Sequence, residues 1–264
     1  MSSPTTTRRR DGIDPRLRAR RIEVRREEGR RRLRRLGMLA GVVVAVALAF
    51  AVTRSPILDI DRVEVTGAEH TRPVTVRAAA GLARGDALLY ADLRTARRAV
   101  EALPWVAAAR VTRHWPGTVR IVIEERVAAG VLPAEGGGWV VADGDGRVLE
   151  HVEDPPPGLA RLAGVGAVPA DGSVAGDDAK VLLGVVARLP MALRAAVTSV
   201  VASGAEIELG VTLLDGGSAT VRFGPPELVE EKLLALAALL SGADPAGMSS
   251  IDVRVPSVPV VTRT

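Results

Sequence analysis

The sequence predicts an α+β protein in which a single transmembrane helix is followed by a small mixed module and then by a larger, β-rich domain with covering helices. Three observations predict this class. An uncharged apolar run lies near the N-terminus, short runs that alternate apolar and polar residues are separated by Gly and Pro, and a few longer runs have helical spacing. Their order along the chain places the apolar helix first and the two folded parts after it.

Charge divides the chain at residue 35. Residues 1–35 contain 14 Arg and 5 acidic residues, a net charge of +9, whereas the whole chain carries only +4, which leaves −5 for the remainder. A basic segment beside an apolar run is typical of contact with anionic lipid, whereas nucleic-acid binding needs a basic surface on the folded part. We therefore predict a disordered, basic cytoplasmic tail over 1–35 that meets anionic membrane lipid, and no nucleic-acid partner.

The apolar run over 36–53 has 18 residues and no charge, and Arg35 and Arg54 close it. At 1.5 Å per residue it would span about 27 Å, close to the thickness of a bilayer core. The excess of Arg before it places the N-terminus in the cytoplasm and residues 54–264 outside the plasma membrane. The alternatives are a buried helix of a soluble protein and a cleaved signal peptide. The small-residue triplet Ala49–Ala51 favours cleavage, but the 35 residues before the run and its length argue against it.

A first folded module is predicted over 56–126. The expected elements, in order, are a strand at Ile57–Gly67, a helix from Pro73 that stops at Gly81, a helix at Ala91–Leu103, and strands at Val106–Arg113 and Thr118–Glu125. The second helix places four apolar residues on one face, namely Leu93, Ala96, Val100 and Leu103. Pro116 and Gly117 supply the turn of a hairpin. Two helices should therefore cover one face of a three-stranded sheet.

A second, β-rich domain is predicted over 127–262. The expected elements are a hairpin at Trp139–Glu150, a helix at Asp178–Leu189, a meander of Val197–Ala202, Ala205–Leu209 with Val211–Leu214, and Ala219–Phe223, and a helix at Glu227–Leu240 that Gly242 ends. The last run alternates from Ile251 to Val255 but then contains Pro256 and Pro259. Two prolines exclude a central strand, so an edge strand is predicted there.

The residues give little support for catalysis. The chain has no Cys, which excludes disulfides, thiolate metal sites and a Cys nucleophile. His70, His114 and His151 have no metal-ligand spacing and are interpreted as surface residues, and Lys180 and Lys232 are interpreted as parts of solvated helix faces. Asp143 and Asp145 resemble the start of a calcium loop but fit a hairpin turn better, because the distal ligands are missing. We therefore predict no catalytic residues, no cofactor and no metal site.

Four stretches together resemble the FtsQ/DivIB family of bacterial division proteins. They are the basic tail with its apolar helix, the run ILDIDRVEVTGAEHT, the run EALPWVAAARVTRHWPGTVRIVIEERVAAGVL, and the closing IDVRVPSVPVV after a leucine-rich helix. The third is the most specific, because Trp115, Pro116, Thr118, Glu125 and Arg126 stand where the family has them at the end of its POTRA domain. Arg outnumbers Lys 33 to 2, and the resemblance is to actinobacterial-like members. The same residues also have a structural interpretation, in which Trp105 and Trp115 pack in a core or turn and Glu125 and Arg126 end a strand.

The resemblance implies a non-enzymatic divisome scaffold at the division septum that binds FtsB/FtsL-type bitopic partners and other divisome components. It implies that a partner segment adds to the final strand, here Arg254, Val255, Pro256, Ser257, Val258, Pro259, Val260, Val261 and Thr262. A weaker candidate surface is the preceding helix, with Glu227, Glu230 and Glu231. The alternatives are a POTRA-containing transport or assembly chaperone, which predicts repeated modules and a membrane barrel, and a membrane-anchored extracytoplasmic enzyme.

Overall fold

The computed structural model describes residues 34–48, 50, 58–169, 174–242, 244 and 246–263. Residues 34–48 form a helix. Among the described residues, no helix combines the length and the apolarity that are needed to cross a membrane. Most of the predicted tail and parts of the predicted transmembrane segment lie outside the described residues, so the membrane-spanning helix stays a prediction.

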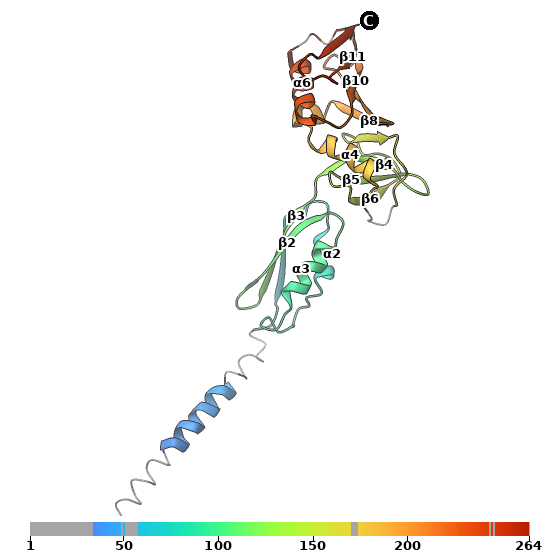
Figure 1. The fold of residues 1–264 in the computed structure, drawn as a ribbon. Helices are drawn as coiled ribbons and strands as arrows, with labels where there is room; N and C mark the ends of the chain where they lie inside the picture. Colours follow the sequence, from blue (N-terminus) through green and yellow to red (C-terminus); the bar gives the residue numbers. More distant parts are fainter. Residues whose placement is uncertain are drawn as a thin grey trace, which may run out of the picture.

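The first module is a three-stranded sheet with two helices, which Figure 1 shows as a separate unit before the larger domain. Its elements are β1 (Arg62–Thr66), α2 (Pro73–Ala80), α3 (Leu93–Glu101), β2 (Val106–His114) and β3 (Thr118–Glu125). The strand order is β1-β3-β2, with β1 parallel and β2 antiparallel to β3. The elements match those predicted, although β1 begins five residues later than Ile57.

Local sequence explains how the two helices begin and end. Pro73 occupies the first turn of α2, where a missing N–H costs nothing, and Gly81 closes the helix with a φ of 63° that favours glycine. The carboxylate of Asp92 accepts hydrogen bonds from the N–H groups of Arg94 and Thr95 and so caps α3. One core is buried between these helices and the sheet, formed by Ile60, Val76, Ala80, Leu88, Ala96, Val100, Val106, Ala109, Val119, Ile121 and Ile123.

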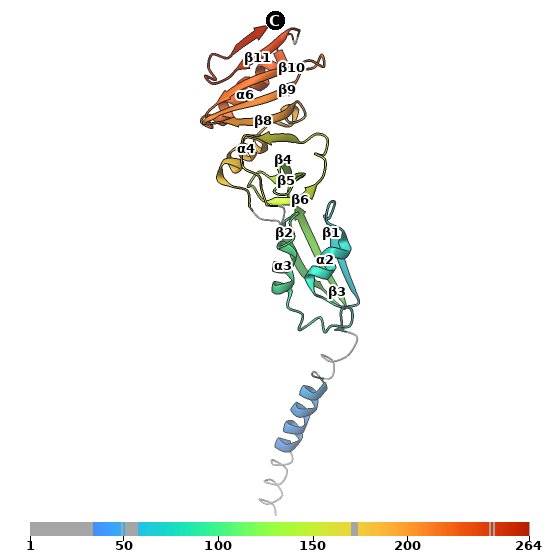
Figure 2. The ribbon, with the colours of Figure 1, turned by 90° about the vertical axis from the view of Figure 1, so that its right-hand side faces the viewer.

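The second domain is built on one nine-stranded sheet of order β12-β11-β10-β9-β8-β7-β4-β5-β6. Its strands are β4 (Ala128–Pro133), β5 (Trp139–Asp143), β6 (Val148–Val152), β7 (Ala160–Ala163), β8 (Val197–Ser203), β9 (Glu206–Thr212), β10 (Ser218–Gly224), β11 (Met248–Asp252) and β12 (Val260–Arg263). Its helices are α4 (Asp177–Ala187), α5 (Met191–Arg194) and α6 (Val229–Gly242). Figures 1 and 2 show that β6 lies toward the first module and β12 at the far end.

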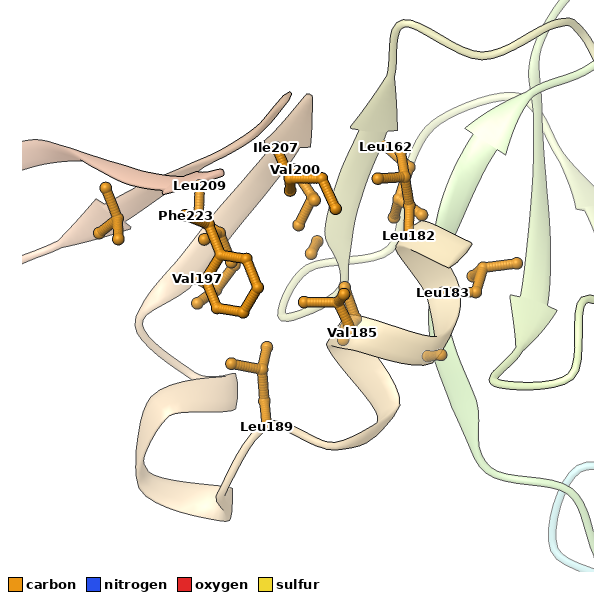
Figure 3. Close-up of a cluster of buried hydrophobic side chains, with 14 of the residues drawn as sticks. Leu162, Leu182, Leu183, Val185, Leu189, Val197, Val200, Ile207, Leu209 and Phe223 are labelled. Carbon is orange, nitrogen blue, oxygen red and sulfur yellow. The ribbon is translucent and has the colours of Figure 1, made fainter. Parts of the chain in front are cut away.

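One apolar core runs along a single face of this sheet. Leu182 of α4 lies beside Leu162 of β7 (Figure 3). Leu183 and Val185 of α4, Val200 and Leu209 of the strands, and Leu233 and Leu236 of α6 are buried in the same cluster. A smaller cluster of Val131, Val141 and Leu149 lies apart from that core, and Trp105 of the first module packs against it. The predicted α+β class is therefore confirmed.

Several predicted elements need correction. β4 and β7 were not expected, β9 runs without a break through Gly210, and α6 begins at Val229 rather than Glu227. Lys232 is not part of a solvated face, because its side chain is only 2% exposed. Its ammonium group donates a hydrogen bond to the carbonyl of Pro225 at 2.7 Å and lies 5.1 Å from the centre of the Phe223 ring. Desolvation lowers the pKa of Lys232, although Glu227 and Glu206 act in the opposite direction.

Candidate partner-binding edge

β12 is the last strand of the nine-stranded sheet. It pairs antiparallel with β11, with Val261 opposite Ile251 and Val260 opposite Asp252. Within the part of the chain that the structure describes, no strand pairs with the other side of β12. Alternate N–H and C=O groups of this short strand therefore point away from the sheet and are available to an incoming strand.

The predicted edge strand over Arg254–Thr262 is wrong in its extent. Only Val260, Val261 and Thr262 belong to β12, whereas residues 254–259 form a turn in which the N–H of Val258 donates to the carbonyl of Val255 at 3.1 Å. Both prolines fall in this turn, where they remove no ladder hydrogen bond. The sequence pattern indicated an edge correctly, but the prolines mark the loop before the edge and not the edge itself.

The apolar side chains at this edge are divided between solvent and core. Val255, Val258 and Val260 are 58%, 67% and 55% exposed, and Arg254, Ser257 and Thr262 are also exposed. Val261 packs against the large core, and Pro256 and Pro259 are half-buried. Three exposed valines within six residues give an incoming strand apolar contacts in addition to backbone hydrogen bonds.

An ion pair holds the start of the turn. The guanidinium of Arg254 donates to Asp252 at 2.7 Å, and the backbone N–H of Arg254 also donates to that carboxylate. These hydrogen bonds lower the pKa of Asp252 and raise the pKa of Arg254. The stem of Arg254 lies over Gly224, where a Cβ would stand 2.9 Å from its Cγ. The turn is therefore anchored to the end of β10.

The second predicted surface is placed near the first turn of α6. Glu230 and Glu231 lie in that turn and Glu227 lies just before the helix, and all three are exposed. Leu234, on the next turn, is also exposed. Carboxylates at a helix N-terminus are favoured by its dipole, so these charges are also explained without a partner.

A second group of interacting residues, from the sequence runs that include His70, Glu125 and Arg126, lies at the junction between the two folded parts. The carboxylate of Glu125 accepts hydrogen bonds from the N–H groups of His70 and Thr71 and contacts Nδ1 of His70 at 2.9 Å. The His70 ring stacks on Trp105 with 4.2 Å between the ring centres. Burial alone would raise the pKa of Glu125, but the hydrogen bonds from His70 and Thr71 outweigh it and lower the pKa to about 2.

Arg126 continues this junction into the second domain. Its side chain donates to Asp143 at 2.7 Å and to the carbonyl of Val106, and its N–H donates to the carbonyl of Trp105. Asp143 also accepts from the N–H groups of Asp145 and Arg147. Sequence reasoning missed this cluster: His70 has an acid partner, but 55 residues away, and Asp143 is an ion-pair residue within a hairpin turn.

The junction contains ionisable side chains and a cleft. Among the described residues, no three His, Cys, Asp or Glu side chains are grouped so that they could hold a metal ion. A cleft of about 590 Å³ opens at the junction, lined by Arg126, Asp143, Arg188 and Arg194 among others. Two of the charged residues that line it, Arg126 and Asp143, form an ion pair with each other, which fits a role in holding the two domains together.

Comparison with known proteins agrees with this geometry. Residues 58–126 match the family model described as the POTRA domain of FtsQ type. These residues contain the whole first module, from the segment before β1 to the Arg126 junction.

Curated relatives extend the similarity over most of the chain. The chain is 31% identical to the cell division protein FtsQ of Streptomyces collinus over 243 residues, which cover 89% of this chain and 90% of that protein. It is 34% identical over 221 residues to FtsQ of Mycolicibacterium smegmatis, and 30% identical over 131 residues to FtsQ of Corynebacterium glutamicum. These two matches cover 62% and 58% of the relatives, so the chain spans less than two thirds of their length.

Proposed function

Because the chain belongs to the FtsQ family of cell division proteins, we propose that it is a non-enzymatic scaffold of the bacterial divisome, anchored in the plasma membrane by residues 36–53. Its folded part, a POTRA domain over 56–126 and a β domain over 127–262, lies outside the cytoplasm. It captures FtsB/FtsL-type bitopic division proteins and so supports septum formation.

The single observation that carries the proposal is the open side of β12. A partner strand that pairs with Val260–Arg263 extends the nine-stranded sheet by a tenth strand and satisfies backbone groups of both chains. Val255 and Val258 in the adjoining turn give the partner apolar contacts, because both are exposed. Backbone pairing supplies affinity here, and the valines supply selectivity.

The carboxylates near the start of α6 add a second contact. Glu227, Glu230 and Glu231 are exposed together, and they suit a partner helix with basic residues. Exposed charges mainly raise association rates and register selectivity, so their removal should weaken capture less than damage to the edge.

Substitution at the edge tests the proposal. In Val260→Asp, a charge stands where the partner's apolar side chain packs, so capture of an FtsB/FtsL-type partner in a pull-down is expected to fall at least about tenfold. The matched control is Val74→Asp on α2, because Val74 is 62% exposed and lies in the other domain. If both variants capture partner equally, β12 is not the binding edge. If Val260→Asp also loses thermal stability to the same degree as it loses partner capture, Val260 belongs to the core and not to the binding edge.

Depletion tests the cellular role. Cells that lose this protein are expected to form filaments or branches with failed septa. Normal septation in a strain without a second copy would contradict the divisome assignment.

A further inference from the structure

Three segments of the POTRA domain meet at the end where its chain begins. The N–H of Leu88 donates to the carbonyl of Leu58 at 3.0 Å, and the N–H of Asp61 donates to the carbonyl of Gly117 at 2.7 Å. The guanidinium of Arg113 reaches across to the carbonyl of Leu88 at 2.8 Å. Residues 58–62, 83–94 and 113–117 therefore form one surface, which we call the Leu58 rim.

The Leu58 rim exposes large apolar side chains. Leu89, Tyr90 and Trp115 are 40%, 65% and 55% exposed, and Tyr90 is the only tyrosine of the chain. The other two tryptophans, Trp105 and Trp139, are half-buried. Single exposed apolar residues are common on protein surfaces, but three that share one end of a small domain indicate a contact surface.

The length of the connecting chain limits how far this rim can lie from the membrane. Five Cα–Cα steps separate Thr53, the last residue of the apolar run, from Leu58, and they span at most about 18 Å when fully extended. A bilayer's headgroup layer is about 5–8 Å thick on each side of its apolar core. With residues 36–53 in the membrane, the rim stays within reach of the headgroups, whereas β12 lies at the opposite end of the molecule (Figure 2).

We propose that the Leu58 rim rests on the outer surface of the lipid bilayer, with Trp115 and Tyr90 in the headgroup layer. The inference rests on the membrane anchoring proposed above. Trp and Tyr favour this layer, because the ring enters the apolar boundary while its N–H or O–H group stays hydrated. The rim contains four Arg and four Asp residues, so its charge is balanced and the contact does not depend on anionic lipid. Resting on the membrane limits the tilt of the POTRA domain and holds β12 at a set height.

Tryptophan quenching tests this contact in the full chain reconstituted in phosphatidylcholine vesicles. Residues 36–53 contain no Trp, so any quenching by lipid comes from the folded part. A nitroxide at the lipid headgroup is expected to quench the wild-type emission more than a nitroxide deep in the acyl chains. The emission that the headgroup nitroxide removes should disappear in Trp115→Phe and persist undiminished in the matched control Trp139→Phe.

The outcomes separate this contact from the anchor. Flotation of the chain with vesicles tests the anchor. If the chain does not float, both the proposed anchor and the proposed contact are wrong. A chain that floats but shows no quenching keeps the anchor and overturns the contact, which leaves the rim to a protein partner. Quenching that requires anionic lipid would overturn the aromatic basis of the contact.

Discussion

The domain junction and the distal edge each contain an Arg–Asp ion pair, but the two pairs have different roles. Arg126 meets Asp143, and Arg254 meets Asp252, each at 2.7 Å. The junction side chains are 21% and 7% exposed, whereas those at the edge are 49% and 25% exposed. The difference shows that burial, and not the pair itself, decides the role: the junction pair ties two domains together, and the edge pair shapes a turn that leaves its neighbours open.

The largest expected effect follows from the junction pair. Asp143→Ala leaves Arg126 without its carboxylate in a mostly buried position, and loss of one partner of a buried pair costs about 3–5 kcal/mol of unfolding free energy. Asp252→Ala is the matched control and should cost much less, because water screens that pair. Urea unfolding followed by tryptophan emission measures both. Equal losses would mean that the two regions do not differ as their burial indicates.

Glu125 should make the junction sensitive to acid. Its pKa is about 2 in the folded chain and 4.5 ordinarily, so its carboxylate contributes stability above about pH 4.5 that is lost as the pH falls toward 2. Glu125→Gln is therefore expected to lower the unfolding free energy by about 1–2 kcal/mol at pH 7, because solvent screening reduces the full value of the pKa shift, and by progressively less down to pH 2. A difference that stays constant over this range would show that the hydrogen bonds of Glu125 do not depend on its charge.

The smallest effects are expected at the edge. Val261→Ala removes side-chain atoms that pack on the core and should cost about 1 kcal/mol, whereas Val260→Ala should stay within about 0.5 kcal/mol. Thermal unfolding of both variants beside the parent measures this contrast. A greater loss of stability from Val260→Ala than from Val261→Ala would show that Val260, and not Val261, packs on the core.

Local signals in the sequence predicted most elements but few of their long-range partners. α2, α3, β2 and β3 follow directly from helix caps, spacing and a Pro-Gly turn. The sequence does not predict β4, because Gly130 and Pro133 weaken its strand pattern. It does not predict β7, because that strand has only four residues. β7 is defined by parallel neighbours on both sides, and parallel partners distant in sequence leave no local pattern.

The candidate sites were predictable to a similar degree. The prolines indicated an edge near the C-terminus, although the strand itself begins only at Val260. The burial of Lys232 could not be predicted, because the carbonyl of Pro225 and the ring of Phe223 meet its ammonium group only through the packing of α6 against the end of β10. Likewise, the partner of His70 becomes adjacent only after β3 has paired with β1.

The strand order has a mechanical consequence. The chain enters the nine-stranded sheet from the first module at β4, and β7, β8, β9, β10, β11 and β12 follow from there to the far end, so a pull between the first module and β12 would load the ladders from β4 to β12 in series (Figure 1). A series linkage yields first at its weakest member. The β4–β7 ladder has only two residue pairs, and α4 packs against both strands of that ladder. Because α4 packs across this short ladder, it holds the two parts of the sheet together where the strand pairing is shortest.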